Sequence, residues 1–202
     1  MTKMHPENPD KFASKAEKKT FKLIKEKLPD EYTAYYNYRI NGKEFDFAIL
    51  VPEKGIVIIE VKGHFEKNVV RVIDNTSIEL KDKETLKSPM KQALGYRNSL
   101  LDRMDKKFGD EKLKNNVPIV PMVCYPNISR NFFYEKGLYE ISEEEETIFR
   151  EEFNSEQIII EKIDSLLEKK KSELYINHVS SLSLKKAIEV WNTEKLIENS
   201  VR

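Results

Sequence analysis

The sequence predicts an α/β fold, because segments with helical periodicity alternate along the chain with segments of strand periodicity. Residues 14–28 and 88–104 carry apolar side chains at intervals of three or four, as amphipathic helices do. Residues 32–40 and 44–62 instead alternate or run apolar over strand lengths. The expected order is a helix, three strands, minor strands, a second helix and another strand, followed by two more helices.

The first helix is predicted to begin after Ser14, a residue type that favours the N-cap position, and to end before a proline. Its apolar positions are Phe21, Ile24 and Leu28. The motif "SKAE" has the form of a capping box, in which Ser14 and Glu17 satisfy backbone donors at the helix start. Glu17 could equally reach a site beside the helix, and both interpretations stay open.

Three strands are expected next. Residues 32–40 place alternate side chains on one face: Tyr32, Ala34, Tyr36, Tyr38 and Ile40. The second strand does the same with Phe45, Phe47, Ile49 and Val51. The motif "PEKG", residues 52–55, joins this strand to the third as a hairpin. Residues 56–59 are apolar on both faces, which predicts that the third strand is central.

The rest of the chain contains weaker signals. The segments "VVRVI" and "SIEL" suggest short strands, and Ser88 with Pro89 predicts the start of the second helix. A core strand is expected in "VPIVPMVCYP" despite its internal prolines. Amphipathic patterns in residues 155–171 and 182–197 predict two further helices. We expect residues 1–168 to form the main domain and residues 169–202 a C-terminal helical appendage or linker.

The composition excludes several classes of protein. Lys and Arg (35) balance Asp and Glu (35), so any phosphate-binding surface must be local. A single cysteine and three scattered histidines lack the spacing of a zinc site. Apolar runs are much shorter than the ~20 residues that a membrane helix needs, and no signal peptide is evident. We expect a cytoplasmic protein without a membrane span.

Three charged side chains interrupt the apolar hairpin. Glu60 and Lys62 lie two apart on a strand, so they share a face and are roughly 7 Å apart along it. The hairpin brings Asp46 opposite Glu60 within one residue of register. Two carboxylates repel one another unless a cation lies between them, and Mg²⁺ prefers oxygen ligands.

This cluster therefore predicts metal-assisted hydrolysis, in which Lys62 steadies an attacking water or the charge on a phosphate. A solvated ion pair of Glu60 and Lys62 on an edge strand is the alternative. Gln92 and Tyr96 lie one helical turn apart, so both could reach the same site or simply form an exposed helix surface.

The residues quoted so far resemble a known family. The segments "LPDEYTAYYNYRI", "EFDFAILVPEKGIVIIEVKG" and "SPMKQALGY" are similar to the NERD (nuclease-related) domain of the PD-(D/E)xK nuclease superfamily, over about residues 14–128. The resemblance implies a restriction-endonuclease-like mixed central β-sheet flanked by helices, and cleavage of DNA that depends on Mg²⁺ or Mn²⁺. Phe45 precedes Asp46 where the superfamily motif has proline, which removes no ligand.

The resemblance also implies roles for individual residues. Asp46 and Glu60 would ligate the metal with help from the Val61 carbonyl, and Lys62 would be catalytic. Glu17 would be the acidic residue of the first helix. Gln92 would orient the site, and Tyr96 would contact DNA. Further contacts to the DNA backbone are expected from local basic residues: Lys15, Lys18, Lys19, Lys22 and Arg103.

Three functions follow as hypotheses. The first is a metal-dependent DNA nuclease of DNA repair or of defence against foreign DNA, with a helicase as the partner that the resemblance suggests. The second is a DNA-binding accessory module with little or no cleavage. The third is a protein-interaction adaptor that uses the acidic segment "SEEEE", residues 142–146, and the helix of Trp191.

Overall fold

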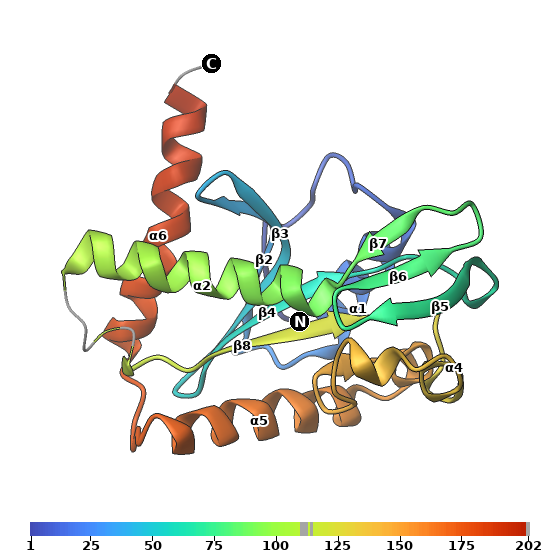
Figure 1. Cartoon of the computed structure of the whole chain (residues 1–202). Helices are drawn as coiled ribbons and strands as arrows, with labels where there is room; N and C mark the ends of the chain where they lie inside the picture. The colour runs from blue at the N-terminus through green and yellow to red at the C-terminus, as the bar shows by residue number, and fades with distance from the viewer. Residues whose placement is uncertain (110–112, 114, 201–202) are drawn as a thin grey trace.

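A six-stranded mixed sheet forms the centre of the protein, in a computed structural model that describes residues 1–109, 113 and 115–200, the last ten without their side chains (Figure 1). The strand order is β1-β2-β3-β4-β8-β9. The strands are Lys3–His5 (β1), Thr33–Ile40 (β2), Lys43–Val51 (β3), Gly55–Val61 (β4), Ile119–Cys124 (β8) and Thr147–Ile148 (β9). β2, β3 and β4 are antiparallel, whereas β1 joins β2, and β8 joins β4 and β9, in parallel. The predicted fold class is confirmed.

Helices cover both faces of this sheet. α1 (Lys15–Lys27) and α5 (Glu156–Glu173) share one apolar cluster with the sheet, while α2 (Pro89–Phe108) and α6 (Ser181–Ser200) share another on the opposite face. Figure 1 shows α2 crossing the sheet with α6 beside it. The described residues also contain a short helix, α4 (Arg130–Glu135), and three 3₁₀ turns, Glu66–Asn68, Leu138–Glu140 and Arg150–Asn154.

The minor strands form a separate antiparallel sheet rather than an extension of the central one. Its strands are β5 (Val69–Asp74), β6 (Ser77–Leu80) and β7 (Thr85–Lys87), in that order. The chain enters this sheet after β4 and leaves it directly into α2. Val69, Ile78 and Leu80 pack in a third apolar cluster with Phe133 and Phe149, which anchors the small sheet to the main body.

The hairpin and its central strand are as the sequence predicts. β3 and β4 pair from Val51 opposite Gly55 to Phe47 opposite Ile59. Every residue of β4 is buried, because β3 and β8 flank it and helices cover both faces. β8 tolerates Pro121 because this residue does not face β4. The even-numbered residues Pro118 and Cys124 accept the N–H groups of Ile56 and Lys62, so the odd-numbered position 121, which lacks an N–H, faces the other side.

Part of the predicted alternation in β2 and β3 is wrong. Tyr36 and Phe47 pack in the cluster with α1, as expected, but Tyr38, Ile40 and Phe45 pack in the opposite cluster with α2. The change occurs at Asn37, which has a φ of 58°. The pairs on either side, Tyr36 with Phe47 and Tyr38 with Phe45, place Asn37 opposite Asp46. A left-handed residue rotates the strand, and the side chains beyond it change faces.

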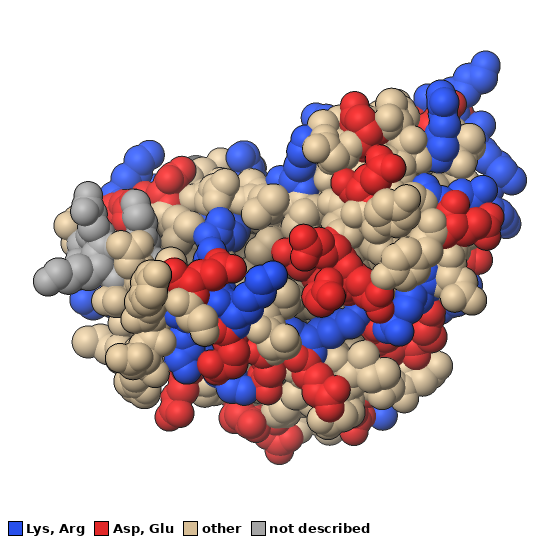
Figure 2. Space-filling model, turned by 60° about the horizontal axis from the view of Figure 1, so that its bottom comes forward, with Lys and Arg blue, Asp and Glu red and all other residues tan. Residues whose placement is uncertain are grey.

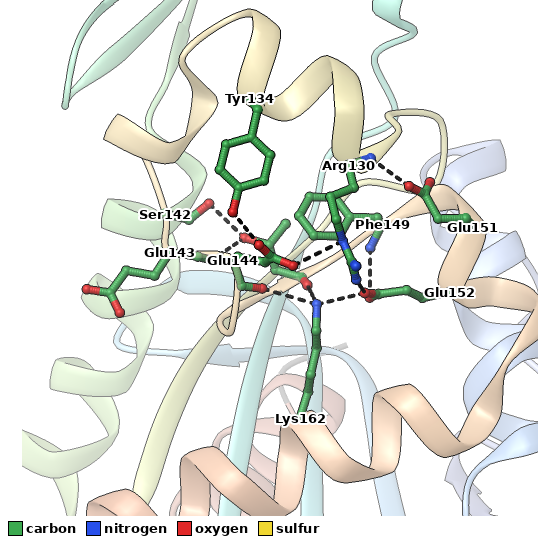
Figure 3. Close-up of polar contacts among 10 residues, drawn as sticks. Arg130, Tyr134, Ser142, Glu143, Glu144, Phe149, Glu151, Glu152 and Lys162 are labelled. Carbon is green, nitrogen blue, oxygen red and sulfur yellow. Dashed lines mark hydrogen bonds and ion pairs between the residues drawn. The ribbon is translucent and has the colours of Figure 1, made fainter.

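A buried network of charges fastens the segment after β8 to the body (Figure 3). Glu152 is 1% exposed, and its Oε1 forms salt bridges with Arg130 Nη2 at 2.6 Å and with Lys162 Nζ at 2.8 Å. Its other oxygen accepts the Phe149 N–H at 3.1 Å. Both cations also lie over the Phe149 ring. The network joins α4, β9 and the 3₁₀ turn of residues 150–154 to α5.

The C-terminal segment also contributes to the core. The predicted boundary between residues 168 and 169 falls inside α5, and four residues beyond it are buried against the sheet and α2: Val179, Leu184, Ala187 and Val190. The division into domain and appendage therefore stays a prediction. The Trp191 side chain lies outside the described residues. No helix in the described part of the chain is long and apolar enough to cross a membrane.

Candidate active site

The end of β4 brings together the polar residues that interrupt the predicted hairpin. Lys62 Nζ donates to Glu60 Oε1 at 2.6 Å and to Gln92 Oε1 at 3.0 Å. Glu60 is 3% exposed. Gln92 comes from the first turns of α2, and its amide nitrogen donates to the Lys87 carbonyl at 3.4 Å, which turns its oxygen toward Lys62. Helical spacing alone left the position of Gln92 open, and the family resemblance implied its place beside Lys62.

Glu60 and Lys62 do not form the exposed pair of the alternative interpretation. The Lys62 side chain is only 16% exposed and that of Glu60 only 4%. β4 is an interior strand of the sheet, so the pair lies at a covered strand end. A buried pair of this kind carries a desolvation cost that an exposed pair avoids.

Asp46 lies at the same strand end through an unusual contact. Its Oδ2 accepts the Val61 N–H at 2.6 Å, just beyond the last residue pair of the β3–β4 ladder. The neighbours Phe45 and Phe47 pack on opposite faces of the sheet, so the Asp46 side chain points along the sheet toward β4. The N–H and C=O of a strand residue point to the same side, so the Val61 carbonyl lies on the side of Asp46.

Glu17 approaches this strand end from α1. Ser14 caps the helix by accepting the Glu17 N–H at 3.1 Å, which confirms the predicted N-cap. The Glu17 carboxylate accepts hydroxyl hydrogens from Ser14, at 2.8 Å, and from Tyr36, also at 2.8 Å. α1 can come this close because Gly63 has no side chain: a Cβ there would lie 2.8 Å from Ala16 Cβ.

The three acids at this strand end affect one another electrostatically. Burial raises the pKa of Asp46 to about 7, and the charges of Glu60 and Glu17 add to this effect. Burial also raises the pKa of Glu60, with Lys62 opposing and Glu17 adding to the rise. The pKa of Tyr96 is raised as well, first by burial and then by the carboxylates of Glu60 and Asp46. Tyr96 lies one helical turn beyond Gln92 on α2 and packs against the apolar cluster on that face of the sheet.

The donor set at this strand end fits a divalent cation. Glu60 Oε2 is buried without a hydrogen-bond partner in the described chain, which is costly unless another group, such as a metal, uses it. Asp46 and Glu60, with the Val61 carbonyl, carry oxygen atoms of the hard type that Mg²⁺ and Mn²⁺ prefer as ligands. No group of three or more His, Cys, Asp and Glu in the described residues is arranged to hold a metal. Asp46 and Glu60 would be the two carboxylate ligands of such a cation, whereas the Glu17 carboxylate accepts from the hydroxyls of Ser14 and Tyr36.

The predicted DNA-contacting residues are not all at this site. Lys18 is exposed on α1 next to Glu17, and Lys22 is exposed one turn further, 3.9 Å from Glu26. Lys15 is also exposed, whereas Lys19 donates to the Pro126 carbonyl at 2.8 Å. Arg103 lies eleven residues beyond Gln92 on α2, roughly 16 Å along the helix axis, so it is remote from Lys62.

Charge is also mixed on the face of the molecule that Figure 2 shows. Figure 2 shows Lys and Arg side chains intermingled with Asp and Glu over the face that is turned forward. This agrees with the balanced composition of the chain. A DNA-binding surface would therefore consist of local basic stretches such as the exposed side of α1.

Sequence reasoning missed two residues that shape the site. Tyr36 was assigned to the core only, since a tyrosine in an alternating strand carries no signal of its hydroxyl partner. Asn37 could have been suspected, because asparagine tolerates left-handed backbone better than most residues. The period-two pattern of β2 itself does not show that the side chains change faces at Asn37.

Comparison with known proteins agrees with the geometry. The family model of the nuclease-related domain, NERD, matches residues 13–126, more than half of the chain. This range includes every predicted site residue, from Glu17 to Arg103. Searches of curated proteins and of solved structures found no match. On the strength of the family match, this chain belongs to the NERD, or nuclease-related domain, family.

Proposed function

We propose that this protein is a metal-dependent DNA nuclease that hydrolyses phosphodiester bonds. The observation that carries the proposal is the cluster at the end of β4, where Asp46 and Glu60 lie beside the ammonium of Lys62. DNA repair and defence against foreign DNA are cellular settings in which such an activity serves. Membership of the nuclease-related family supports the same reaction class.

Asp46, Glu60 and the Val61 carbonyl would hold the cation, Mg²⁺ or Mn²⁺. When bound, such a cation would lower the pKa of a water molecule and neutralise charge on the phosphate. The buried, unpartnered Glu60 Oε2 and the raised pKa of Asp46 both indicate a site that is poorly satisfied by the protein alone. Formally, three carboxylates and one ammonium leave a charge that a divalent ion would balance.

Lys62 is oriented to stabilise negative charge on the substrate. An ammonium group has three hydrogens, and Glu60 and Gln92 accept two of them. The third remains to donate to a phosphate oxygen or to the attacking water. Charge that grows on the phosphate in the transition state is then met by a donor that is already fixed in place.

Digestion of linear, nicked and single-stranded DNA with Mg²⁺ or Mn²⁺ tests the proposal. The wild type should produce cleavage that chelator abolishes. Asp46→Ala and Lys62→Ala should each lower kcat by roughly 10²–10³-fold, as loss of a transition-state contact does. Lys54→Ala is the matched control, because Lys54 pairs with Asp164 near the hairpin turn, at the opposite end of β4.

Equal cleavage by all four proteins would contradict the proposal. DNA that is retained by the wild type at low salt without any metal-dependent product would instead indicate the accessory module.

A further inference from the structure

The Tyr36 hydroxyl donates to Glu17 Oε2 over 2.8 Å, although the two residues lie on different elements, β2 and α1. Tyr36 is 2% exposed and Glu17 is 9% exposed, so water does not compete for this bond. We propose that Tyr36 is a positioning residue of the candidate active site, which holds the Glu17 carboxylate beside Asp46 and Glu60 and thereby sets the affinity for a divalent cation. This inference rests on the metal-dependent function proposed above.

The direction of the hydroxyl is fixed by a second contact. The Ala13 N–H donates to the Tyr36 oxygen at 3.2 Å. That oxygen therefore accepts from the backbone, and its hydrogen is left to point at Glu17. Burial raises the pKa of Tyr36, and the nearby carboxylates Glu17 and Asp46 add to this rise, so the hydroxyl stays protonated and remains a donor.

The tyrosine ring has little freedom to move. Its centroid lies 5.4 Å from that of Phe12, 5.8 Å from that of Phe21 and 5.1 Å from that of Phe47. The left-handed residue Asn37 follows directly and turns the rest of β2 to the other face of the sheet. Tyr36 thus presents its hydroxyl to α1 from a ring that is already ordered, and holding Glu17 costs little further entropy.

Glu17 needs such support because like charges surround it. Its negative charge raises the pKa of both Asp46 and Glu60, and this repulsion favours a carboxylate that turns away. Ser14 donates to Oε1 and Tyr36 to Oε2, so each oxygen is held by one hydroxyl. Each oxygen also keeps a lone pair that its hydroxyl donor does not use, through which Glu17 can act on a bound cation.

A purely structural tyrosine would make the same contacts and predicts a different result. Removal of its hydroxyl would lower stability without changing how the protein responds to a cation. The chain offers a matched control in Tyr32, which is 4% exposed and donates to Asp164 Oδ1 at 3.2 Å. Asp164 lies on α5 and pairs with Lys54, away from the strand end that carries Glu60.

The experiment compares wild type, Tyr36→Phe and Tyr32→Phe by calorimetric titration with Mn²⁺ and by melting temperature with and without Mg²⁺. Each variant loses one tyrosine–carboxylate hydrogen bond, so both should melt at a lower temperature. Only Tyr36→Phe should weaken cation binding, by roughly 10-fold, as loss of an outer partner of a metal site does. In a Glu17→Gln background, Tyr36→Phe should weaken binding no further, because Tyr36 acts through Glu17.

Unchanged cation affinity in Tyr36→Phe overturns the inference, as does an equal loss in Tyr32→Phe. A wild-type protein that binds neither cation overturns the proposed function and this inference together. Cation binding by the wild type that is unaffected in Tyr36→Phe overturns the inference alone, so the two failures are distinguishable.

Discussion

Asn37 lies opposite Asp46 at the position where β2 and β3 change the faces on which their side chains pack. The φ of 58° at Asn37 therefore belongs to the same local irregularity that points Asp46 along the sheet to the Val61 N–H. The strained residue Asn37 thus lies next to a proposed metal ligand, and strained backbone is often found at functional sites.

The backbone of Asn37 gives a first prediction. Asn37→Ala should destabilise the fold by about 1 kcal/mol, because asparagine tolerates left-handed backbone better than alanine does. Asn37→Gly should be nearly neutral, because glycine has no Cβ to clash in this conformation. Denaturant unfolding of the three proteins measures the difference. An alanine variant as stable as the glycine variant would show that the left-handed conformation is not what matters at this position.

Removal of the Asp46 charge should stabilise the metal-free protein at alkaline pH. The pKa of Asp46 is raised from 3.8 to about 7 by burial and neighbouring acids, so the folded state holds a proton that the unfolded chain has already lost. Wild-type stability should therefore fall as the pH rises from about 4 to 7, and the full penalty should persist above pH 7. Asp46→Asn removes that penalty and keeps an oxygen for the Val61 N–H.

We expect Asp46→Asn to exceed the wild type by roughly 4 kcal/mol at pH 8 in chelator, with the difference shrinking toward pH 5. Urea unfolding at the two pH values measures this. A variant that is less stable than the wild type at pH 8 would contradict the raised pKa. Asp164→Asn, which loses the salt bridge to Lys54, should show no such gain and serves as the control.

The close approach of α1 to the end of β4 predicts that Gly63 is sensitive to substitution. Gly63→Ala would bring a Cβ within 2.8 Å of Ala16 Cβ, so α1 must shift and carry Glu17 with it. The overpacking should cost about 1–3 kcal/mol and reduce the rise in melting temperature caused by Mg²⁺.

Gly42→Ala is the matched control for Gly63→Ala. Gly42 has a φ of 72°, and a Cβ there would meet no atom within 4 Å, so alanine strains only a turn remote from the acids. The substitution should lower stability and leave the Mg²⁺ response as in the wild type. A Gly63→Ala protein with a normal Mg²⁺ response would argue against a role for α1 in the site.

The charge network around Glu152 should be important for stability but not for the cation. Glu152→Gln leaves Arg130 and Lys162 without their shared buried carboxylate and should cost roughly 3 kcal/mol. Glu168→Gln removes only a surface pair with Lys171 and should cost less than about 1 kcal/mol. Denaturant unfolding compares the two, and a similar small cost for both would mean that the network contributes little.

The parts of the site that could be predicted are those whose residues lie close together in the sequence. Glu60 and Lys62 are two residues apart on one strand, and a short turn fixes the register of Asp46 against them. The period of a strand and the length of a hairpin turn are local properties, so a pattern in the sequence reveals them. The start of α2 was likewise marked by Ser88 and Pro89, which put Gln92 on the first turns of the helix.

The sequence by itself determined the α/β fold class, the hairpin, the two capped helices and the acid–lysine cluster, because periodicity and turn chemistry act over a few residues. Only the tertiary structure decided that Tyr36 donates to Glu17, that Arg103 is remote from Lys62, and that the faces of β2 and β3 exchange at Asn37. These outcomes depend on how separate elements pack and on which polar group each buried hydroxyl meets. Helical or strand spacing constrains neither, since it fixes only the direction of a side chain relative to its own element.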